Sequence, residues 1–526
     1  MRSRRMAALS IVSTIVALLA ALAPPAFADD ISESKGFRKA VTLAGIREHQ
    51  AAFQAHSNAN GGNRVGGSPG YNASRDYVIA KMQAAGYVVT THAFEFLFNA
   101  DRTPPTLQQV SPTATTYVDG VDYSSMTFSG SIPSSTASVF AVDLALPAAP
   151  GPGATTSGCE AADFAGMPAG SIALMQRGTC TFGQKADNAT AAGAIASIIF
   201  NDGGDAGRIG MISGTLGPGT HGPAVGTTLA LGQDLANGIS SGPTGSTVTI
   251  RIDRIEETRT THNVIAETPG GDPNRVVVVG AHLDSVPRGP GINDNGSGSA
   301  GILEIAEVYA AQRRVPRNKL RFMWFGAEEF GLLGSNAYVA SLSQAERDKI
   351  TAMVNFDMIG SPNFVRFIYD GDNSAFPVDP PNVAAGPPGS AYLESLFVDY
   401  FNAVDLASDP TPFNGRSDYG PFIAVGIPAG GLFTGAEGVK TAAQVATYGG
   451  TAGQQYDPCY HLACDTFANN SNSGLDQMSD AAAHVVLTLS RTKVDVRQTD
   501  AATALRTSGS LVADAPMHLH EEPDDR

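Results

Sequence analysis

The stretch VVVVGAHLDSVPRGPGINDNGSG, residues Val276–Gly298, decides the fold that we predict for the chain. Its four consecutive valines predict a strand buried on both faces of a parallel sheet. His282 and Asp284 follow where that strand would end, and a loop rich in glycine and proline then leads to Asp294 before a helical pattern begins. Open α/β sheets bind ligands beyond the carboxyl ends of their strands. A histidine with a carboxylate there suits a divalent metal, zinc above all, whereas a single such loop could equally be a polar cap on a core strand.

The same pattern recurs downstream, which favours the metal site over the polar cap. The strand-like LRFMWF is followed by Glu328 and Glu329, and MVNF is followed directly by Asp357. CYHLAC places Tyr460 and His461 inside a small cysteine loop. Each motif also has an ordinary explanation. Glu328 and Glu329 could form the acidic first turn of a helix, and Asp357 could be a turn or cap residue. The two cysteines of CYHLAC could bind a structural zinc ion.

Together these motifs supply two histidines and four carboxylates, enough for two metal ions that share one carboxylate. Paired ions roughly 3.5–4 Å apart stabilise the attacking and leaving oxygens of a hydrolysis. One glutamate would remain outside the metal shell and take a proton from the attacking water. The residues therefore predict metal-assisted hydrolysis.

The N-terminal 28 residues predict a secretory signal peptide, because three arginines precede an apolar run and the small-residue end Ala26-Phe27-Ala28. We expect cleavage after Ala28, and no later apolar stretch is long enough to span a bilayer. The mature chain would be secreted, with no membrane segment. Its net charge would change from −16 to −19 (34 − 3 − 50), which argues against nucleic acid or an anionic membrane as a partner.

Changes in composition and hydrophobic pattern along the chain predict one α/β domain with a second domain inserted into it. Residues 29–102 and 249–492 alternate strand-like and helix-like patterns, whereas residues 103–248 are rich in Ser, Thr, Gly and Pro with short apolar runs. Residues 493–526 are polar and irregular and predict a disordered tail. The four cysteines allow three pairings, and we favour Cys159–Cys180 and Cys459–Cys464 because each pair lies within one local segment.

Several motifs of the chain resemble those of a known family. AHLDS, GINDNGSGSAG, FGAEEFGLLGS, NFDMIGSPN, GRSDYGPF, GGLFTGAE and CYHLACDT, in this order and spacing, are similar to those of the secreted bacterial dizinc leucine aminopeptidases of metallopeptidase family twenty-eight. The insert, through GSIALMQRGTCTFGQKADNATAAGA, resembles a protease-associated domain. The resemblance implies a zinc exopeptidase fold, a mixed and mostly parallel sheet flanked by helices, with an inserted mainly β domain. It also implies two zinc ions per chain and peptide substrates with a free N-terminus, hydrolysed at a leucine-like first residue.

The resemblance also implies a role for individual residues. One zinc would be held by His282, Asp294 and Asp357, and the other by Glu329, His461 and the shared Asp294. Glu328 would be the general base, Asp284 would accept a hydrogen bond from the free nitrogen of His282, and Tyr460 would donate one to the oxyanion. Arg416 and Phe433 match positions that line the substrate pocket.

Calcium and the end of the substrate that is recognised remain open. Asp476 and Asp480 match two acids of a calcium site found in relatives, but the third acid aligns with Ala40-Val41, so calcium is only possible here. A carboxypeptidase or dipeptidase could use the same metals, with Arg416 gripping a substrate carboxylate. A non-catalytic binding protein built around the insert is disfavoured, because such a protein has no need of all the ligands and the base together.

Overall fold

The computed structural model describes residues 26–148, 151, 153–204, 208–217, 219–376 and 385–499. The predicted signal peptide lies almost wholly outside these ranges, and so do residues 500–526 of the predicted tail. Residues 493–499 are packed on the body: Val496 is buried and Arg497 Nε donates to the carbonyl of Ile350 at 2.7 Å. The predicted start of the tail at residue 493 is therefore too early.

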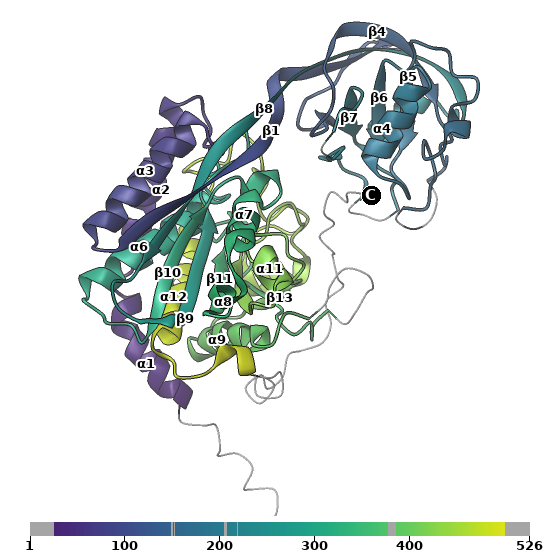
Figure 1. Ribbon diagram of the computed structural model, residues 1–526. Coiled ribbons are helices and arrows are strands. Elements are labelled where there is room, and N and C mark those ends of the chain that lie inside the picture. The colour runs from purple at the N-terminus through teal and green to yellow at the C-terminus, as the bar shows by residue number, and fades with distance from the viewer. Residues whose placement is uncertain are drawn as a thin grey trace, which may run out of the picture.

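The α/β body is built on a mixed sheet whose central strands are parallel (Figure 1). Its strand order is β13-β12-β14-β11-β9-β10-β8, and β9 pairs in parallel with both β10 and β11. The bounds are β8 Gly242–Glu267, β9 Asp272–His282, β10 Asn318–Phe325, β11 Ile350–Phe356, β12 Phe367–Tyr369, β13 Asp409–Thr411 and β14 Ala429–Phe433. The carboxyl ends of β9, β10, β11 and β14 consequently meet at one edge of the sheet.

The valines of β9 face both layers of the body, as their uninterrupted run predicts. Val277 and Val279 pack in the core under helices α6 (Gly296–Ala311), α9 (Ser390–Ala403) and α12 (Asn472–Arg491). Val276 and Val278 pack on the opposite side with α7 (Leu333–Ser341) and α10 (Gly420–Ala424). The predicted zinc exopeptidase architecture, a mostly parallel sheet flanked by helices, is therefore confirmed.

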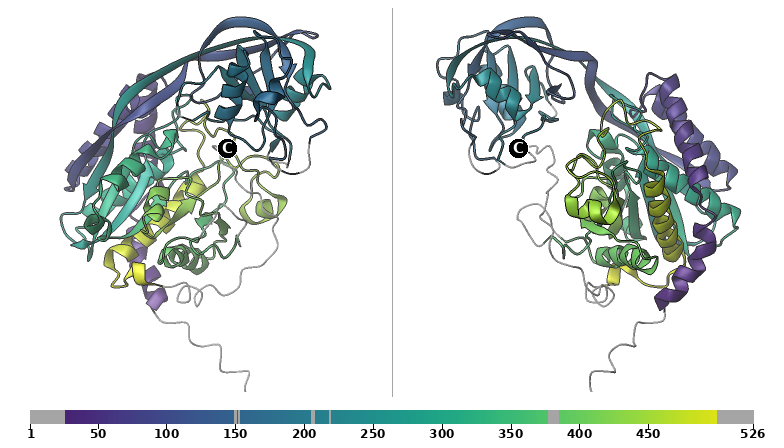
Figure 2. Two further views of the ribbon diagram at one scale, coloured as in Figure 1. Left: turned by 45° about the vertical axis from the view of Figure 1, so that its right-hand side comes forward. Right: turned by 180° about the vertical axis from the view of Figure 1, so that it is seen from behind.

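The N-terminal helices cover the outside of this body. They are α1 (Ala26–Arg38), α2 (Leu43–Ala59) and α3 (Pro69–Ala84). α2 packs along α6, and α1 packs along α12 (Figure 2). The short helices α8 (Gln344–Arg347) and α11 (Ala442–Tyr448) lie in connections. Within the described residues, no helix combines the length and the apolar character that a membrane crossing requires.

The inserted domain lies to one side of the α/β body and is joined to it by a two-stranded ribbon (Figures 1 and 2). The ribbon consists of β1 (Val88–Ser111) and β8, which pair antiparallel from Val88↔Glu267 to Ser111↔Thr247. The insert continues the sheet in the order β8-β4-β5-β6-β7-β3, and helices α4 and α5 pack on these strands. Its bounds are β2 Thr115–Thr116, β3 Tyr123–Ser125, β4 Ile132–Ala141, β5 Ile172–Gln176, α4 Phe182–Ala191, β6 Ala196–Phe200, β7 Ala224–Thr227 and α5 Leu229–Ala236.

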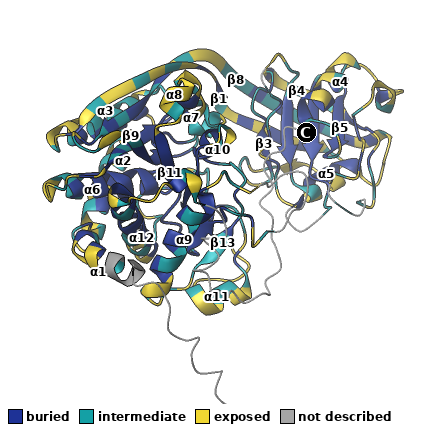
Figure 3. Cartoon of the chain, turned by 60° about the horizontal axis from the view of Figure 1, so that its bottom comes forward, coloured by how far each residue is buried: buried dark blue, intermediate teal, exposed yellow. Residues whose placement is uncertain are grey.

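Each part has its own buried core, visible as separate dark blue groups of strands in Figure 3. The insert's core includes Leu107 from β1 and Val248 from β8, whereas Val264 of the same β8 belongs to the core of the α/β body. The ribbon strands thus supply side chains to both cores.

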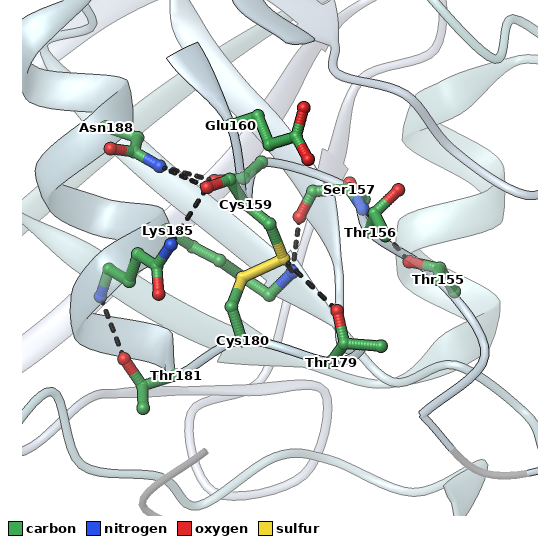
Figure 4. The surroundings of a disulfide bond; sticks show 12 residues. Thr155, Thr156, Ser157, Cys159, Glu160, Thr179, Cys180, Thr181, Lys185 and Asn188 are labelled. Carbon is green, nitrogen blue, oxygen red and sulfur yellow. Dashed lines mark hydrogen bonds between the residues drawn. A yellow bond between two sulfur atoms is a disulfide. The ribbon is translucent and has the colours of Figure 1, made fainter. Parts of the chain in front are cut away.

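Both predicted disulfides are present, Cys159–Cys180 and Cys459–Cys464. The first lies in the insert beside α4, where Asn188 Nδ2 donates to the carbonyl of Cys159 at 2.9 Å (Figure 4). Lys185 is buried in the same place, and its ammonium group donates to the carbonyl of Ser157. Burial lowers the pKa of Lys185 to about 8. This disulfide therefore fastens a loop to α4 and lies outside the α/β body.

Candidate active site

The ends of three neighbouring strands and the segments that follow them carry five of the six predicted metal-site residues to one place. His282 is the last residue of β9, and Asp357 directly follows β11. Glu328 and Glu329 open the single turn η3 (Glu328–Phe330) just beyond β10, so they do form an acidic first turn, of a short 3-10 helix. Asp294 precedes Asn295, whose side chain caps α6 by accepting from Gly298 N–H. His461 arrives separately, from the disulfide loop before α12.

Asp294 lies between the two histidines, one carboxylate oxygen toward each. Its Oδ1 is 3.2 Å from His282 Nε2, and its Oδ2 is 3.1 Å from His461 Nε2. Asp357 Oδ1 lies 3.3 Å from His282 Nε2 on one side, and Glu329 Oε2 lies 3.0 Å from His461 Nε2 on the other. The structure thus brings together two ligand sets that meet at one carboxylate.

The residues present fit a pair of cations. Nitrogen Nε2 of His282, oxygen Oε1 of Glu329 and oxygen Oδ1 of Asp357 are buried, and none of them has a hydrogen-bond partner among the described residues. Buried polar atoms without partners are costly unless something binds them. The donor set of imidazole nitrogens and carboxylate oxygens is the one that zinc prefers. Zinc bound here would satisfy these atoms together.

Electrostatics supports the same conclusion, because the carboxylates are crowded and hidden from water. Burial, together with the negative charge of Asp294, raises the pKa of Glu329 to about 7. The pKa of Glu328 is raised well above its usual value, first by burial. The pKa of His282 is also raised, because the charges of Asp357 and Glu328 outweigh its burial. Positive charge bound at the site would keep these carboxylates ionised.

Asp284 makes hydrogen bonds that differ from the one predicted for it. Its Oδ1 lies 3.7 Å from His282 Nδ1, which is long for a hydrogen bond. The same carboxylate accepts the backbone N–H groups of Glu328, at 3.1 Å, and of Glu329, at 3.4 Å. Asp284 therefore fixes the turn that carries both glutamates, while its charge faces the histidine.

The expected substrate-pocket residues lie at the rim of this site. Arg416 Nη1 is 3.5 Å from Glu437 Oε1, so the guanidinium has an acidic partner within the chain. Phe433 ends β14 and stacks on Tyr369, with ring centroids 6.4 Å apart, and on Phe367 at 6.1 Å. The ring of Tyr460 stacks on that of His461, with centroids 3.8 Å apart.

Three further residues, for which the sequence predicted no role, hold the ligands in place. Arg64 is fully buried; its Nε donates to the carbonyl of Pro290 at 2.8 Å, and its other nitrogens donate to the carbonyls of Leu283 and Gly291. Asp465 accepts the N–H groups of Asn293, at 2.8 Å, and of Asp294, at 3.0 Å. Ser417 Oγ donates to Asp357 Oδ2 at 2.6 Å.

In the sequence, only position could have indicated these residues. Asp465 lies in the motif CYHLACDT, Ser417 lies in GRSDYGPF, and Arg64 lies between two pairs of glycines.

The insert touches the edge of the site. Asp119 Oδ1 lies 2.8 Å from Arg288 Nη2, and Ser124 Oγ accepts from the same nitrogen at 3.2 Å. Arg288 belongs to the loop between His282 and Asp294. A Cβ atom on Gly120 would lie 2.8 Å from Arg288 Nη1 and 3.7 Å from the side chain of Leu462, the neighbour of His461. One loop of the insert therefore rests against both metal-bearing loops.

Comparison with known proteins assigns the chain to a family. A peptidase family M28 model matches residues 263–486, and a PA domain model matches residues 141–235. An aminopeptidase from Pseudomonas aeruginosa is 46% identical over 88% of this chain and 84% of its own length. The chain belongs to peptidase family M28. Leucine aminopeptidase 2 from Trichophyton tonsurans is 40% identical to this M28 peptidase, over 85% of the chain and 83% of its own length.

Solved structures agree with this assignment. The aminopeptidase from Aneurinibacillus sp. strain AM-1 matches with a TM-score of 0.64 and 27% identity, over 88% of this chain and 97% of that one. A zinc aminopeptidase from Bacillus subtilis matches with a TM-score of 0.59 at 24% identity, over 87% and 98% of the two chains, which shows a shared fold. The predicted family and the predicted protease-associated domain are thereby confirmed.

Proposed function

We propose that this M28 peptidase is a secreted dizinc aminopeptidase that removes a hydrophobic first residue from peptides. The broader class, a metallo-aminopeptidase, is confirmed by the family match together with the aminopeptidase relatives. The single observation that carries the proposal is the position of Asp294, whose two oxygens face His282 and His461. That arrangement supports two zinc ions sharing one carboxylate: His282, Asp294 and Asp357 for one, Asp294, Glu329 and His461 for the other.

Zinc bound there supplies positive charge, which lowers the pKa of an attacking water and polarises the scissile carbonyl. The chain's own residues supply the rest. Glu328, which lies beyond both ligand sets, takes the proton from the water and passes it to the leaving amine. The Tyr460 hydroxyl donates a hydrogen bond to the oxygen on which negative charge develops. Asp284 fixes the turn that carries both glutamates through backbone hydrogen bonds, and Ser417 orients the carboxylate of Asp357.

The charges around the site favour the amino end of a substrate. Glu328 and Asp357 offer negative charge to an ammonium group, which needs such partners when it is desolvated. The cation expected to grip a terminal carboxylate in the alternative reading is Arg416, and it is already near Glu437. The carboxypeptidase or dipeptidase function is therefore the weaker candidate.

The aromatic rim supports a leucine-like first residue. Phe433 is half-buried and stacks on Tyr369, whose ring centroid also lies 4.7 Å from that of Tyr419. An aliphatic side chain placed against these rings would gain about 25 cal/mol per Å² of apolar surface removed from water.

A pair of reciprocally blocked peptides tests the proposal. One hydrophobic peptide has a free N-terminus and an amidated C-terminus, and its partner is acetylated and ends in a free carboxylate. Only the first should lose its terminal residue, and a scan of that residue should favour leucine over charged side chains. Trimming of the acetylated peptide would instead establish the carboxypeptidase reading, with Arg416 as the carboxylate clamp.

Secretion and calcium are separate parts of the proposal. Export with cleavage after Ala28 is supported by the N-terminal pattern and by the two disulfides, which suit an oxidising compartment. N-terminal sequencing of protein recovered from culture medium would reject it if residues 1–28 were retained. Calcium at Asp476 and Asp480 is less well supported, because Arg38 Nη1 lies 3.5 Å from Asp480 Oδ2. A thermal midpoint that does not respond to calcium would exclude that ion.

A further inference from the structure

A second cluster of metal-ligand side chains lies between α2 and α6, away from the strand ends. His49 of α2 is 1% exposed, and Glu304 of α6 is 9% exposed. Glu307, one turn further along α6, completes the group at its partly exposed edge. His49 Nε2, one oxygen of Glu304 and one oxygen of Glu307 all lie within 4.8 Å of one another.

Each member of this group has one polar atom held by a neighbour and the other turned toward the centre. His49 Nδ1 is 2.8 Å from the Tyr77 hydroxyl, which leaves Nε2 facing the two carboxylates. Glu304 Oε1 accepts from Thr42 N–H at 3.1 Å and from Thr42 Oγ1 at 3.2 Å, while its Oε2 faces His49.

Glu307 also has one carboxylate oxygen near an outer partner and the other facing the centre of the group. Lys81 Nζ lies 3.4 Å from its Oε1, and its Oε2 is the oxygen that faces His49. All three candidate ligands are therefore oriented by an outer partner, as ligands of protein-bound metals usually are.

The inward atoms are spaced for a shared cation. His49 Nε2 is 3.1 Å from Glu307 Oε2 and 3.8 Å from Glu304 Oε2. Ligands bound to one zinc ion at about 2.0–2.2 Å lie roughly 3.3 Å apart. His49 Nε2 is buried and, among the described residues, makes no hydrogen bond, although Glu307 Oε2 lies only 3.1 Å away. A simple ion pair would instead direct an N–H group at one oxygen.

We propose that His49, Glu304 and Glu307 bind a divalent metal ion of the zinc type in a third site, distinct from the paired centre. The two carboxylates balance the charge of the ion, and the partly exposed edge at Glu307 provides an entry path and room for water. The ion joins α2 to α6, the helix that starts immediately after Asp294. The close fit there is visible at Gly45 in the first turn of α2, where an added Cβ would lie 2.3 Å from the Glu304 carboxylate. The site is structural, and it does not depend on the proposed peptidase reaction.

Zinc titration of the full-length, chelator-stripped protein tests this site. The binding of zinc is followed by competition with a chromophoric chelator, and the thermal midpoint is measured in parallel. The wild-type protein should bind three ions per chain and His49→Gln two, with the kcat of His49→Gln within about twofold of wild type. His56→Gln is the matched control: His56 lies two turns further along α2 and contacts the same Tyr77 ring, but it has no acidic partner among the described residues. It should bind three ions.

A second variant separates a metal site from a buried ion pair. Tyr77→Phe removes only the partner of Nδ1 and should weaken binding of the third ion about 10–100-fold without abolishing it. If His49→Gln folds poorly, Glu307→Gln at the exposed edge replaces it. Equal zinc stoichiometry in wild type and in His49→Gln or Glu307→Gln, with the same rise in thermal midpoint on adding zinc, would overturn the proposal.

Discussion

Asp294 acquires its bridging position from its neighbours along the chain and across the fold. Its N–H is held by Asp465, and Asn295 beside it caps α6 and also donates to the carbonyl of Phe356 at 2.9 Å. The pKa of Asp294 is held well below its usual value because hydrogen bonds to His282 and His461 outweigh its burial. A carboxylate that stays ionised, with its backbone fixed on both sides, is prepared to face two cations.

Glu328 should be separable from metal binding. Glu328→Gln removes the proton acceptor but leaves both ligand sets intact, so the variant should keep its zinc and its thermal midpoint while kcat falls about 10²–10⁴-fold. Glu329→Gln is the matched control, since it alters a ligand and should lose zinc as well as activity. Turnover near the wild-type rate in Glu328→Gln would mean that another group takes the proton.

Arg64 should control the geometry of the loop between His282 and Asp294. Arg64→Lys keeps a positive charge but cannot reach the carbonyls of Leu283, Pro290 and Gly291 together. We expect zinc affinity to fall about 10–100-fold and excess zinc to restore part of the activity. Arg47→Lys, which alters an arginine bonded to the carbonyl of Phe467 instead, should bind zinc normally. Unchanged zinc affinity in Arg64→Lys would show that the charge alone suffices.

At the scale of the elements, runs of apolar residues predicted the central strands well. The valines of β9 and the residues of β11 are buried on both faces and form mainly apolar runs, whereas the run of β10 is interrupted by the half-buried Arg321. The polar residues that follow these strands mark the strand ends. The roles of Arg64 and Asp465 could not be read in this way, because their partners are backbone groups brought from distant parts of the chain. The length of β1 could not be read from the sequence either. Pro104 and Pro105 suggest an interruption, but they fall at a register shift between Thr103 and Thr106, where neither proline has a partner in β8 and the strand continues beyond them.

The packing of α12 against α1 predicts a pH dependence of stability. His484 of α12 is buried, with its Nδ1 2.9 Å from Ser34 Oγ, and burial together with the charge of Arg38 lowers its pKa to about 4. The unfolded chain, with a pKa near 6.5, binds the proton first as pH falls. This contribution is therefore complete above pH 6.5 and is lost between pH 6.5 and 4, by up to about 3 kcal/mol.

Urea unfolding of wild type and of His484→Gln at pH 7 and pH 4.5 measures that contribution. Wild type should lose about 1–3 kcal/mol more between the two pH values than the variant does. Loss of zinc at low pH affects both proteins and cancels in the difference. Identical losses would show that His484 is protonated in the folded state.

At the scale of the whole molecule, the insert should influence access to the site and take no part in the chemistry. Asp101 pairs with Arg254 across the ribbon, so replacing residues 102–253 with Asn-Gly should close β1 and β8 as a hairpin. The shortened protein should keep its zinc and cleave a small chromogenic substrate within a few-fold of the wild-type rate, while rates on long peptides change.

Arg288→Ala, which removes the contacts with Asp119 and Ser124 but keeps the insert, is the milder comparison and should alter the rates on long peptides in the same direction. If the shortened protein keeps zinc but loses activity on every substrate, the insert must contribute to the site itself.

The ribbon should couple the thermal unfolding of the insert to that of the α/β body. Separately folded units joined by a slack tether melt independently and give separate heat-absorption peaks. Here β8 places Val248 in one core and Val264 in the other, and β1 accompanies it along that length. Neither core can lose its strand without fraying the ladder of the other. We therefore expect scanning calorimetry to record one cooperative transition that includes both parts, and zinc bound in the α/β body to raise the melting temperature of the insert as well.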